Sequence, residues 1–113
     1  MQKLTLVYLC TEDKICLAFK KRGFGQGKYN GYGGKLEAGE TITEAAVREV
    51  MEESTCLVHE EDLEQVAELT FLFPDKTLHV SAFFVTSWNG TPQETEEMSP
   101  QWFLYTDIPY ENM

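Results

Sequence analysis

Residues 34–54 read GKLEAGETITEAAVREVMEES, and this stretch decides the fold. Thr41 followed three residues later by Glu44 forms a capping box, a typical signal for the start of a helix. Glu44 and Arg48 lie one helical turn apart and are expected to form an ion pair. The pattern predicts a helix from Ile42 to Ser54.

The predicted helix places carboxylates beside its apolar face. At about 100° per residue, the face expected to pack on a sheet consists of Ile42, Ala46 and Val50. Glu53 projects into that face, and Glu49 and Glu52 lie along its edge. An unpaired carboxylate is costly to desolvate, and Arg48, the only base on the helix, cannot neutralise three glutamates. This favours a site for Mg²⁺ or Mn²⁺, which select hard oxygen ligands, over the alternative of a partly exposed acidic surface.

The composition is that of an ordinary globular domain. With 113 residues, 42% of them hydrophobic, the chain is expected to form one domain over residues 1–113. No apolar run approaches the roughly 20 residues of a membrane helix, and residues 1–10 lack the features of a signal peptide, so a soluble, cytoplasmic protein is expected. The three cysteines, Cys10, Cys16 and Cys56, match no metal-site or disulfide spacing and are expected to be reduced and mostly buried.

The charge pattern suits a small polyanion better than a nucleic acid polymer. A net charge of -10 argues against phosphate-backbone binding, which needs a basic face. Five of the nine basic residues nevertheless lie within residues 20–35, and ten of the nineteen acidic ones lie within residues 37–64. A basic loop followed by an acidic helix fits a small polyanion carried on divalent cations. Two solvated surface segments would explain the charges but not the spacing of the glutamates.

The rest of the chain reads as strands and turns. The predicted strands are Leu4–Leu9, Ile15–Lys20, Val66–Phe73, Leu78–Val85 and Gln101–Tyr105. The first two are expected to form one hairpin, and the third and fourth a second hairpin. Seven glycines between residues 22 and 39 favour a shaped loop over a helix or a regular strand.

The spacing of six residues resembles the Nudix box, which reads Gly, five residues, Glu, seven residues, Arg-Glu, two residues, Glu-Glu. The matching residues are Gly34, Glu40, Arg48, Glu49, Glu52 and Glu53. The chain is therefore similar to the Nudix hydrolases. One departure is Thr55, which stands where the family has a glycine at the helix end. Because threonine adopts the left-handed conformation poorly, a different exit turn is expected.

The resemblance extends to the MutT-like branch, which removes oxidised purine nucleotides. It is carried by residues 20–25 and 28–35, and continues at Thr91-Pro92, Glu97-Met98 and Trp102-Phe103. It implies an α+β fold, an α/β/α sandwich in which a mixed central sheet carries the Nudix helix on one side. A second helix, usual near the C-terminus on the other side, is missing from a sequence that ends at Met113.

The resemblance also implies a reaction and a metal site. The reaction is Mg²⁺-dependent hydrolysis of an oxidised purine nucleoside triphosphate, such as 8-oxo-dGTP, to the monophosphate and pyrophosphate, with Mn²⁺ as a substitute metal. It assigns Glu49, Glu52 and Glu53 as metal ligands and catalytic residues, with Glu97 as a fourth ligand, and leaves open which carboxylate is the general base. Arg48, also assigned to catalysis, is expected to hold the ligand carboxylates in place together with Glu40.

The resemblance also implies a second set of residues, which are expected to bind the nucleotide. These residues are Lys20, Phe24, Asn30, Gly33, Gly34, Lys35, Phe71 and Phe73. Asn30 offers a donor and an acceptor to the edge of guanine or its oxo form. The alternative for Phe71 and Phe73 is a place in the core, and the alternative for Lys35 is an exposed loop.

Two other functions remain open at this point. One keeps the metal chemistry but acts on another nucleoside diphosphate derivative. The other is a binding module that senses a nucleotide without cleaving it. No glutamate of the box is lost, which favours an enzyme over the binding module.

Overall fold

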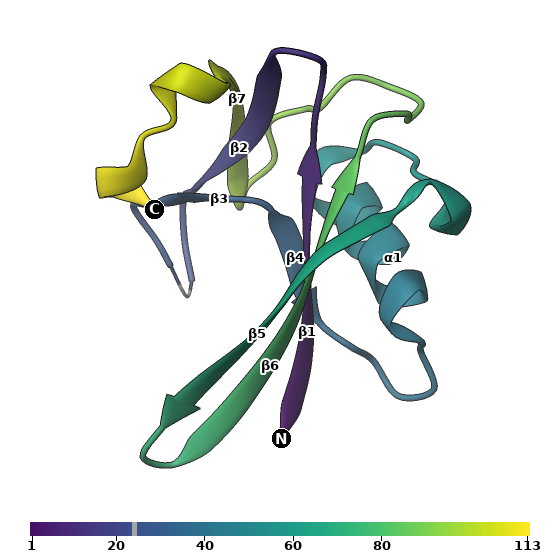
Figure 1. The fold of residues 1–113 in the computed structure, drawn as a ribbon, viewed down its shortest axis with the longest axis vertical. Coiled ribbons are helices and arrows are strands. Elements are labelled where there is room, and N and C mark those ends of the chain that lie inside the picture. The colour runs from purple at the N-terminus through teal and green to yellow at the C-terminus, as the bar shows by residue number, and fades with distance from the viewer. Residues whose placement is uncertain (24) are drawn as a thin grey trace.

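The computed structural model describes residues 1–23 and 25–113, and its centre is a mixed sheet (Figure 1). The strands are β1 (Gln2–Leu9), β2 (Lys14–Lys20), β3 (Tyr29–Asn30), β4 (Tyr32–Lys35), β5 (Glu64–Phe73), β6 (Lys76–Val85) and β7 (Met98–Leu104), and the helix is α1 (Ile42–Ser54). Short 3₁₀ turns occur at Glu60–Asp62, Tyr105–Asp107 and Tyr110–Asn112. The predicted α+β class with a mixed sheet is confirmed.

Two sheets divide the strands between them. The larger sheet has the order β4-β1-β6-β5, in which β1 and β6 are parallel and the other pairs are antiparallel. The smaller sheet, β3-β2-β7, is antiparallel. The predicted hairpin of the first two strands is therefore wrong, because β1 and β2 belong to different sheets. An isolated bridge joins Ile15 of β2 to Cys10, which directly follows β1. The hairpin of β5 and β6 is confirmed.

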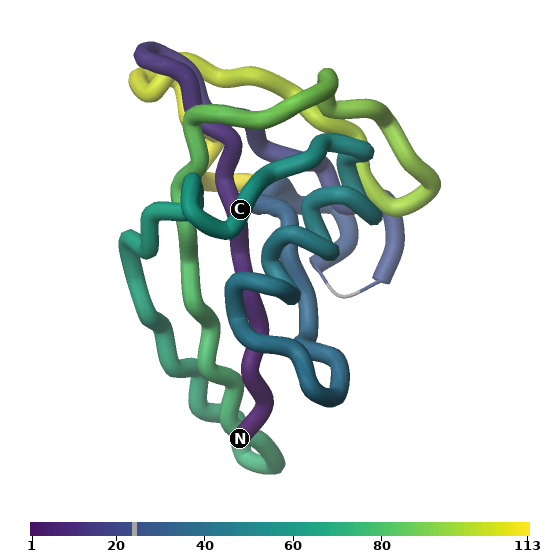
Figure 2. Tube along the Cα trace, turned by 90° about the vertical axis from the view of Figure 1, so that its right-hand side faces the viewer, coloured from purple at the N-terminus to yellow at the C-terminus, as the bar shows by residue number. Residues whose placement is uncertain are grey.

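The helix α1 packs on one face of the larger sheet, against β4 and β1 (Figure 2). It begins at the predicted capping box, in which Thr41 Oγ1 accepts from the Glu44 N–H and the Glu44 side chain accepts from the Thr41 N–H. Ala46 and Val50 are fully buried in the main core, as their place on the apolar face predicts. No second α-helix occurs within residues 1–23 and 25–113. No helix in these ranges is both long and apolar enough to cross a bilayer.

The helix exit differs from the expectation. Thr55 adopts the left-handed conformation that a glycine usually takes at this place, with φ 68°, and its N–H donates to the Met51 carbonyl. The predicted change of exit turn is therefore wrong. The chain keeps the left-handed turn and accepts the steric cost of a branched Cβ.

The glycine-rich segment is more regular than its composition suggests. It contains β3 and β4, so the prediction of a loop is wrong for these residues. A Cβ at Gly33 would lie 1.8 Å from the Thr5 carbonyl oxygen, so only glycine lets β4 approach β1 this closely. The glycines therefore place one strand close to its neighbour.

Candidate active site

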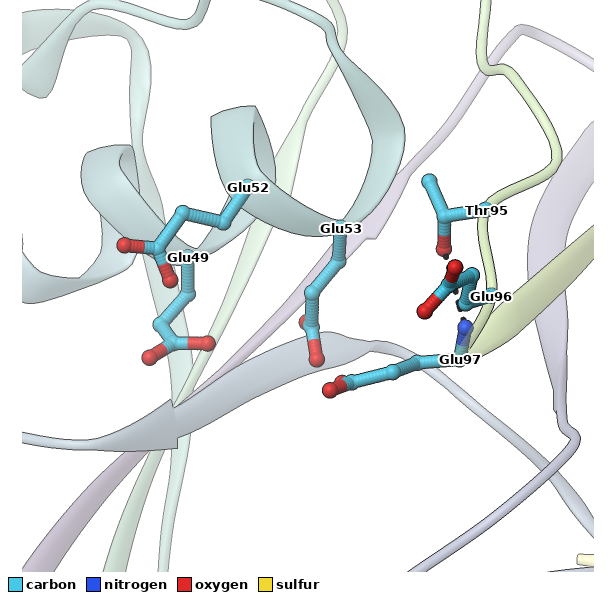
Figure 3. A pocket seen from close by; sticks show the side chains of 6 residues that line it. All are labelled: Glu49, Glu52, Glu53, Thr95, Glu96 and Glu97. Atoms are coloured by element: carbon cyan, nitrogen blue, oxygen red, sulfur yellow. Dashed lines mark hydrogen bonds between the residues drawn. The ribbon is translucent and has the colours of Figure 1, made fainter.

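Five glutamates line one cavity of about 240 Å³ at the side of α1 (Figure 3). The helix supplies Glu49, Glu52 and Glu53, and the segment before β7 supplies Glu96 and Glu97 together with Thr95. Figure 3 shows the Glu97 side chain reaching from that segment toward Glu53. The fold thus brings the four residues predicted as metal ligands to one cavity, although Glu97 lies 44 positions beyond Glu53 in the sequence.

Glu53 is the most deeply placed of these carboxylates. Its residue is 6% exposed, and its Oε1 accepts a hydrogen bond of 2.8 Å from the Gly33 N–H. Burial raises the pKa of Glu53 to about 7, and the charges of Glu49 and Glu97 add to the effect, whereas the Gly33 hydrogen bond and Lys20 oppose it. Burial likewise raises the pKa of Glu49. Without a cation, the cavity therefore disfavours the charged forms of its inner carboxylates.

Arg48 donates hydrogen bonds to three acidic side chains, two of which line the acidic cavity. Its Nε and Nη2 donate to the two oxygens of Glu40 at 2.7 and 2.9 Å, and its Nη1 donates to Glu49 at 2.7 Å and to Glu52 at 3.2 Å. Nη2 also donates to the Lys35 carbonyl at 3.1 Å. The hydrogen bonds from Arg48 lower the pKa of Glu40. This geometry is what the predicted positioning role of Arg48 and Glu40 requires.

The predicted ion pair between Glu44 and Arg48 is wrong. Glu44 is used by the helix cap, where it accepts from the Thr41 N–H at 2.8 Å. Arg48 instead makes a bidentate contact with Glu40, which comes from the loop before the helix. A bidentate, partly buried carboxylate competes better for a guanidinium than an exposed helical neighbour does.

Gly34 lies against the Glu49 carboxylate. A Cβ at this position would be 2.8 to 2.9 Å from the three carboxylate atoms of Glu49. The first residue of the box is therefore a glycine because it leaves space for a side chain of the acidic cavity. Since Gly33 also binds Glu53, β4 positions two of the three helical glutamates.

The donor chemistry of the acidic cavity fits a divalent cation. It gathers carboxylate oxygens, which Mg²⁺ and Mn²⁺ prefer, and burial opposes their negative charge. Among the described residues, no group of three or more acidic, histidine or cysteine side chains already stands close enough to enclose an ion. A bound cation would therefore require side-chain rotations, which the exposed Glu52 and Glu97 can make.

A backbone hydrogen bond and two ion pairs of Arg22 hold the segment that carries Glu97. The Lys21 N–H donates to the Glu97 carbonyl at 2.7 Å, and Arg22 Nη2 lies 3.2 Å from Glu96 Oε2 and 3.8 Å from Glu97 Oε1. Glu96 and Arg22 were not predicted as site residues from the sequence. The sequence shows a run of basic residues at the end of β2 and a run of acidic residues before β7, and this was the signal that could have identified them. The two runs come together only because β2 pairs with β7 in the sheet.

A larger cavity of about 950 Å³ is lined in part by β4, the strand whose Gly33 and Gly34 lie against Glu53 and Glu49 of the acidic cavity. Of the predicted nucleotide-binding residues, it is lined by Lys20, Asn30, Gly33, Gly34, Lys35, Phe71 and Phe73. Phe24 lies outside the described residues. Phe71 and Phe73 are 45% and 40% exposed, so their alternative place in the core is wrong. Three further residues, which were not predicted as site residues, add apolar surface to the same cavity: Leu4, Leu6 and Leu69.

Comparisons with known proteins agree with this arrangement. The model of the NUDIX domain matches residues 2–113. A Danio rerio protein named oxidized purine nucleoside triphosphate hydrolase is 43% identical over 112 residues, which cover 97% of this chain and 70% of the relative. A Mus musculus protein of the same name is 41% identical over 111 residues, covering 96% of this chain and 70% of the relative. The crystal structure of a MutT NUDIX hydrolase from Burkholderia pseudomallei superposes with a TM-score of 0.86 at 18% identity, over 96% of this chain and 86% of that one.

The match along nearly the whole chain includes every glutamate of the box, and the fold gathers those glutamates at one cavity. The chain therefore belongs to the NUDIX domain family and is a Nudix pyrophosphohydrolase.

Proposed function

We propose that this protein hydrolyses an oxidised purine nucleoside triphosphate, such as 8-oxo-dGTP, to the monophosphate and pyrophosphate in the presence of Mg²⁺. The observation that carries the proposal is the position of β4, which lines the apolar cavity with its basic rim and lies against Glu49 and Glu53 of the acidic cavity. The relatives in Danio rerio and Mus musculus bear the name oxidized purine nucleoside triphosphate hydrolase, which supports the same substrate class.

Each cavity would bind a different part of the substrate, the larger one the base and the acidic one the metal-bound phosphates. The apolar surface around Phe71 and Phe73 suits the faces of a purine ring. Lys20 and Lys35 lie at the same cavity and suit the phosphate oxygens of a triphosphate that extends along β4 toward the glutamates. The scissile anhydride would then lie next to the acidic cavity.

The glutamates would hold the metal and the attacking water. Glu49, Glu52, Glu53 and Glu97 are the ligand set, and Mg²⁺ bound there would neutralise phosphate charge and acidify a water. Water adds to one phosphorus and the anhydride P–O bond breaks, so that the oxygen of the broken bond leaves with the other phosphate group. The proton of the water passes to a carboxylate of the cavity. Arg48 keeps Glu49 in place, and the Gly33 N–H keeps Glu53 in place.

A substrate panel tests the proposal. The protein is incubated with 8-oxo-dGTP, dGTP, ATP or ADP-ribose, each with Mg²⁺ and with excess chelator, and the products are separated by chromatography. We expect the highest kcat/KM for 8-oxo-dGTP, pyrophosphate as a product, and no turnover with chelator. A preference for ADP-ribose would identify a different nucleoside diphosphate substrate, and binding without turnover of any compound would identify a sensing module. Either outcome rejects the proposal.

A further inference from the structure

Asn30 lies at the end of β3 with its side chain at the larger cavity. Its Oδ1 accepts two hydrogen bonds, one from the Gly31 N–H at 2.9 Å and one from the Tyr8 hydroxyl at 2.9 Å. A backbone N–H can only donate, so the atom that faces Gly31 must be the amide oxygen. The Tyr8 hydroxyl must then also donate to it. This assigns the orientation of the Asn30 amide from chemistry alone.

The two contacts use both lone pairs of the Asn30 oxygen. An amide oxygen accepts two hydrogen bonds, and the amide nitrogen carries two donors. Within the described part of the chain, the Asn30 nitrogen makes no hydrogen bond to protein, and the side chain is exposed at the cavity. Asn30 therefore presents donors and no acceptor to a ligand, and the expectation that it also offers an acceptor to the base is wrong.

Packing keeps the Tyr8 hydroxyl at this place. The Tyr8 ring lies over Gly31, where a Cβ would be 3.1 Å from the nearest ring carbon, and it meets Phe84 edge-on at a centroid distance of 6.0 Å. Burial raises the pKa of Tyr8, so its hydroxyl stays protonated and remains a donor at neutral pH. Leu4 and Leu6 precede Tyr8 on the same face of β1 and line the same cavity.

We propose that Tyr8 is a positioning residue for base specificity: it fixes the Asn30 amide as a donor, so that the cavity prefers a 6-keto purine to a 6-amino purine. An asparagine that reads adenine donates to N7 and accepts from the 6-amino group. Here the Asn30 oxygen already accepts from Tyr8 and Gly31, so the 6-amino group of an adenine has no acceptor on this side chain. A 6-keto purine presents the O6 acceptor to the free donors of Asn30, in the 8-oxo form as well as in the non-oxidised ring. N7 is a second acceptor in the non-oxidised ring, as in dIMP, whereas in an 8-oxo purine it carries a proton. The inference rests on the proposed function for the identity of the ligand as a purine nucleotide.

Metal-free binding of dIMP and dAMP tests the inference without requiring hydrolysis. The two compounds differ at the 6-position of the purine, and their dissociation constants are measured by calorimetry in the presence of chelator. We expect the wild-type protein to bind dIMP more tightly. We expect Tyr8→Phe to reduce the ratio of the two affinities by roughly three- to tenfold, the effect of one net hydrogen bond. Tyr105→Phe is the matched control, because it removes a hydroxyl that donates to the Thr11 carbonyl, away from the cavity, and should leave the ratio unchanged.

A second variant separates specificity from stability. Asn30→Asp keeps one oxygen to accept from Gly31 and Tyr8 but presents an acceptor to the cavity in place of donors. We expect this variant to prefer dAMP to dIMP.

Unchanged ratios in both Tyr8→Phe and Asn30→Asp, or no binding of either nucleotide at millimolar concentration, would overturn the inference. Turnover of 8-oxo-dGTP together with unchanged ratios would reject the role of Tyr8 and leave the proposed function standing. The predicted ratios without turnover would reject the proposed function and leave the role of Tyr8 standing.

Discussion

Single residues of the acidic cavity differ in burial, and burial decides their roles. Glu53 is 6% exposed and bound by the Gly33 N–H, whereas the Glu52 side chain is more than half exposed. A buried carboxylate keeps its charge only if a cation compensates it. Glu53 is therefore the residue whose charge should matter most for holding a metal.

We expect Glu53→Gln to lower kcat by at least about a hundredfold while the protein stays folded, because the amide keeps the shape but not the charge that a metal needs. The measurement is turnover of 8-oxo-dGTP with Mg²⁺, together with a circular dichroism melt. Glu61→Gln, an exposed carboxylate in the 3₁₀ turn after the helix, is the matched control and should leave kcat unchanged. Near wild-type turnover of Glu53→Gln would remove this residue from the ligand set.

The raised pKa of Glu53 predicts how stability changes with pH in the absence of metal. The folded-state pKa of Glu53 is about 7, against the 4.5 of an ordinary glutamate, so the folded protein binds this proton more tightly than the unfolded chain does. The stability contribution is complete below about pH 4.5 and is lost as the pH rises to about 7. We expect wild type to lose on the order of 3 kcal/mol over this range relative to Glu53→Gln. Urea melts of both proteins from pH 4.5 to 7.5 with chelator measure this difference, and parallel curves would contradict it.

At the scale of elements, the contact between β4 and α1 builds the site. Gly33 and Gly34 are adjacent, yet a Cβ at Gly33 would strike backbone, whereas a Cβ at Gly34 would strike the flexible end of Glu49. Backbone cannot move without disrupting the sheet, but a side chain can rotate. The two glycines should therefore fail in different ways when replaced.

We expect Gly34→Ala to fold and to bind Mg²⁺ more weakly by about tenfold or more, because the new methyl group displaces the Glu49 carboxylate. Gly33→Ala, by contrast, should fail to fold or lose several kcal/mol of stability, since its Cβ would lie 1.8 Å from the Thr5 carbonyl oxygen. Calorimetric titration with Mg²⁺ and thermal melts measure the two effects. Wild-type metal affinity in Gly34→Ala would show that Glu49 does not contribute to the metal site.

The end of α1 offers a stabilising change. Thr55 holds φ at 68°, which costs about 1 kcal/mol for a residue with a Cβ. We expect Thr55→Gly to raise the free energy of unfolding by about 0.5 to 1 kcal/mol, because glycine adopts this conformation without the steric cost. Thr55→Ala, which keeps the Cβ, should gain less. A lower melting temperature for Thr55→Gly would mean that contacts of the Thr55 side chain outweigh the backbone strain.

At the scale of the whole molecule, α1 covers one face of the larger sheet, and the opposite face carries the larger cavity. The edge strand β5 is exposed along most of its length, and Leu72 is 79% exposed. An exposed apolar edge strand presents unpaired backbone groups to other molecules. The described chain therefore has a surface through which copies can associate.

We expect the protein to self-associate with rising concentration and Leu72→Lys to weaken this association, because a charge on the edge opposes strand pairing. Sedimentation velocity over a hundredfold range of concentration measures it. Thr86→Lys adds the same charge on an exposed residue just after β6 and should have no such effect. A monomer at all concentrations would show that β5 is protected as it stands.

The sequence by itself determined the helix and the ligand types. Local signals specify α1, because the capping box and the apolar period act within a few residues of each other, and the box fixes which faces of the helix carry glutamates. The predicted pair of Glu44 with Arg48 failed because Glu40 competes for the guanidinium across a loop.

The tertiary structure alone decided that Glu97 joins Glu53 and that β1 and β2 enter different sheets. It also decided that Asn30 turns its donors to the cavity, because Tyr8 and Asn30 meet only when β1 and β3 are in place. Contacts between distant segments depend on strand order and burial, and neither is written in local residue patterns.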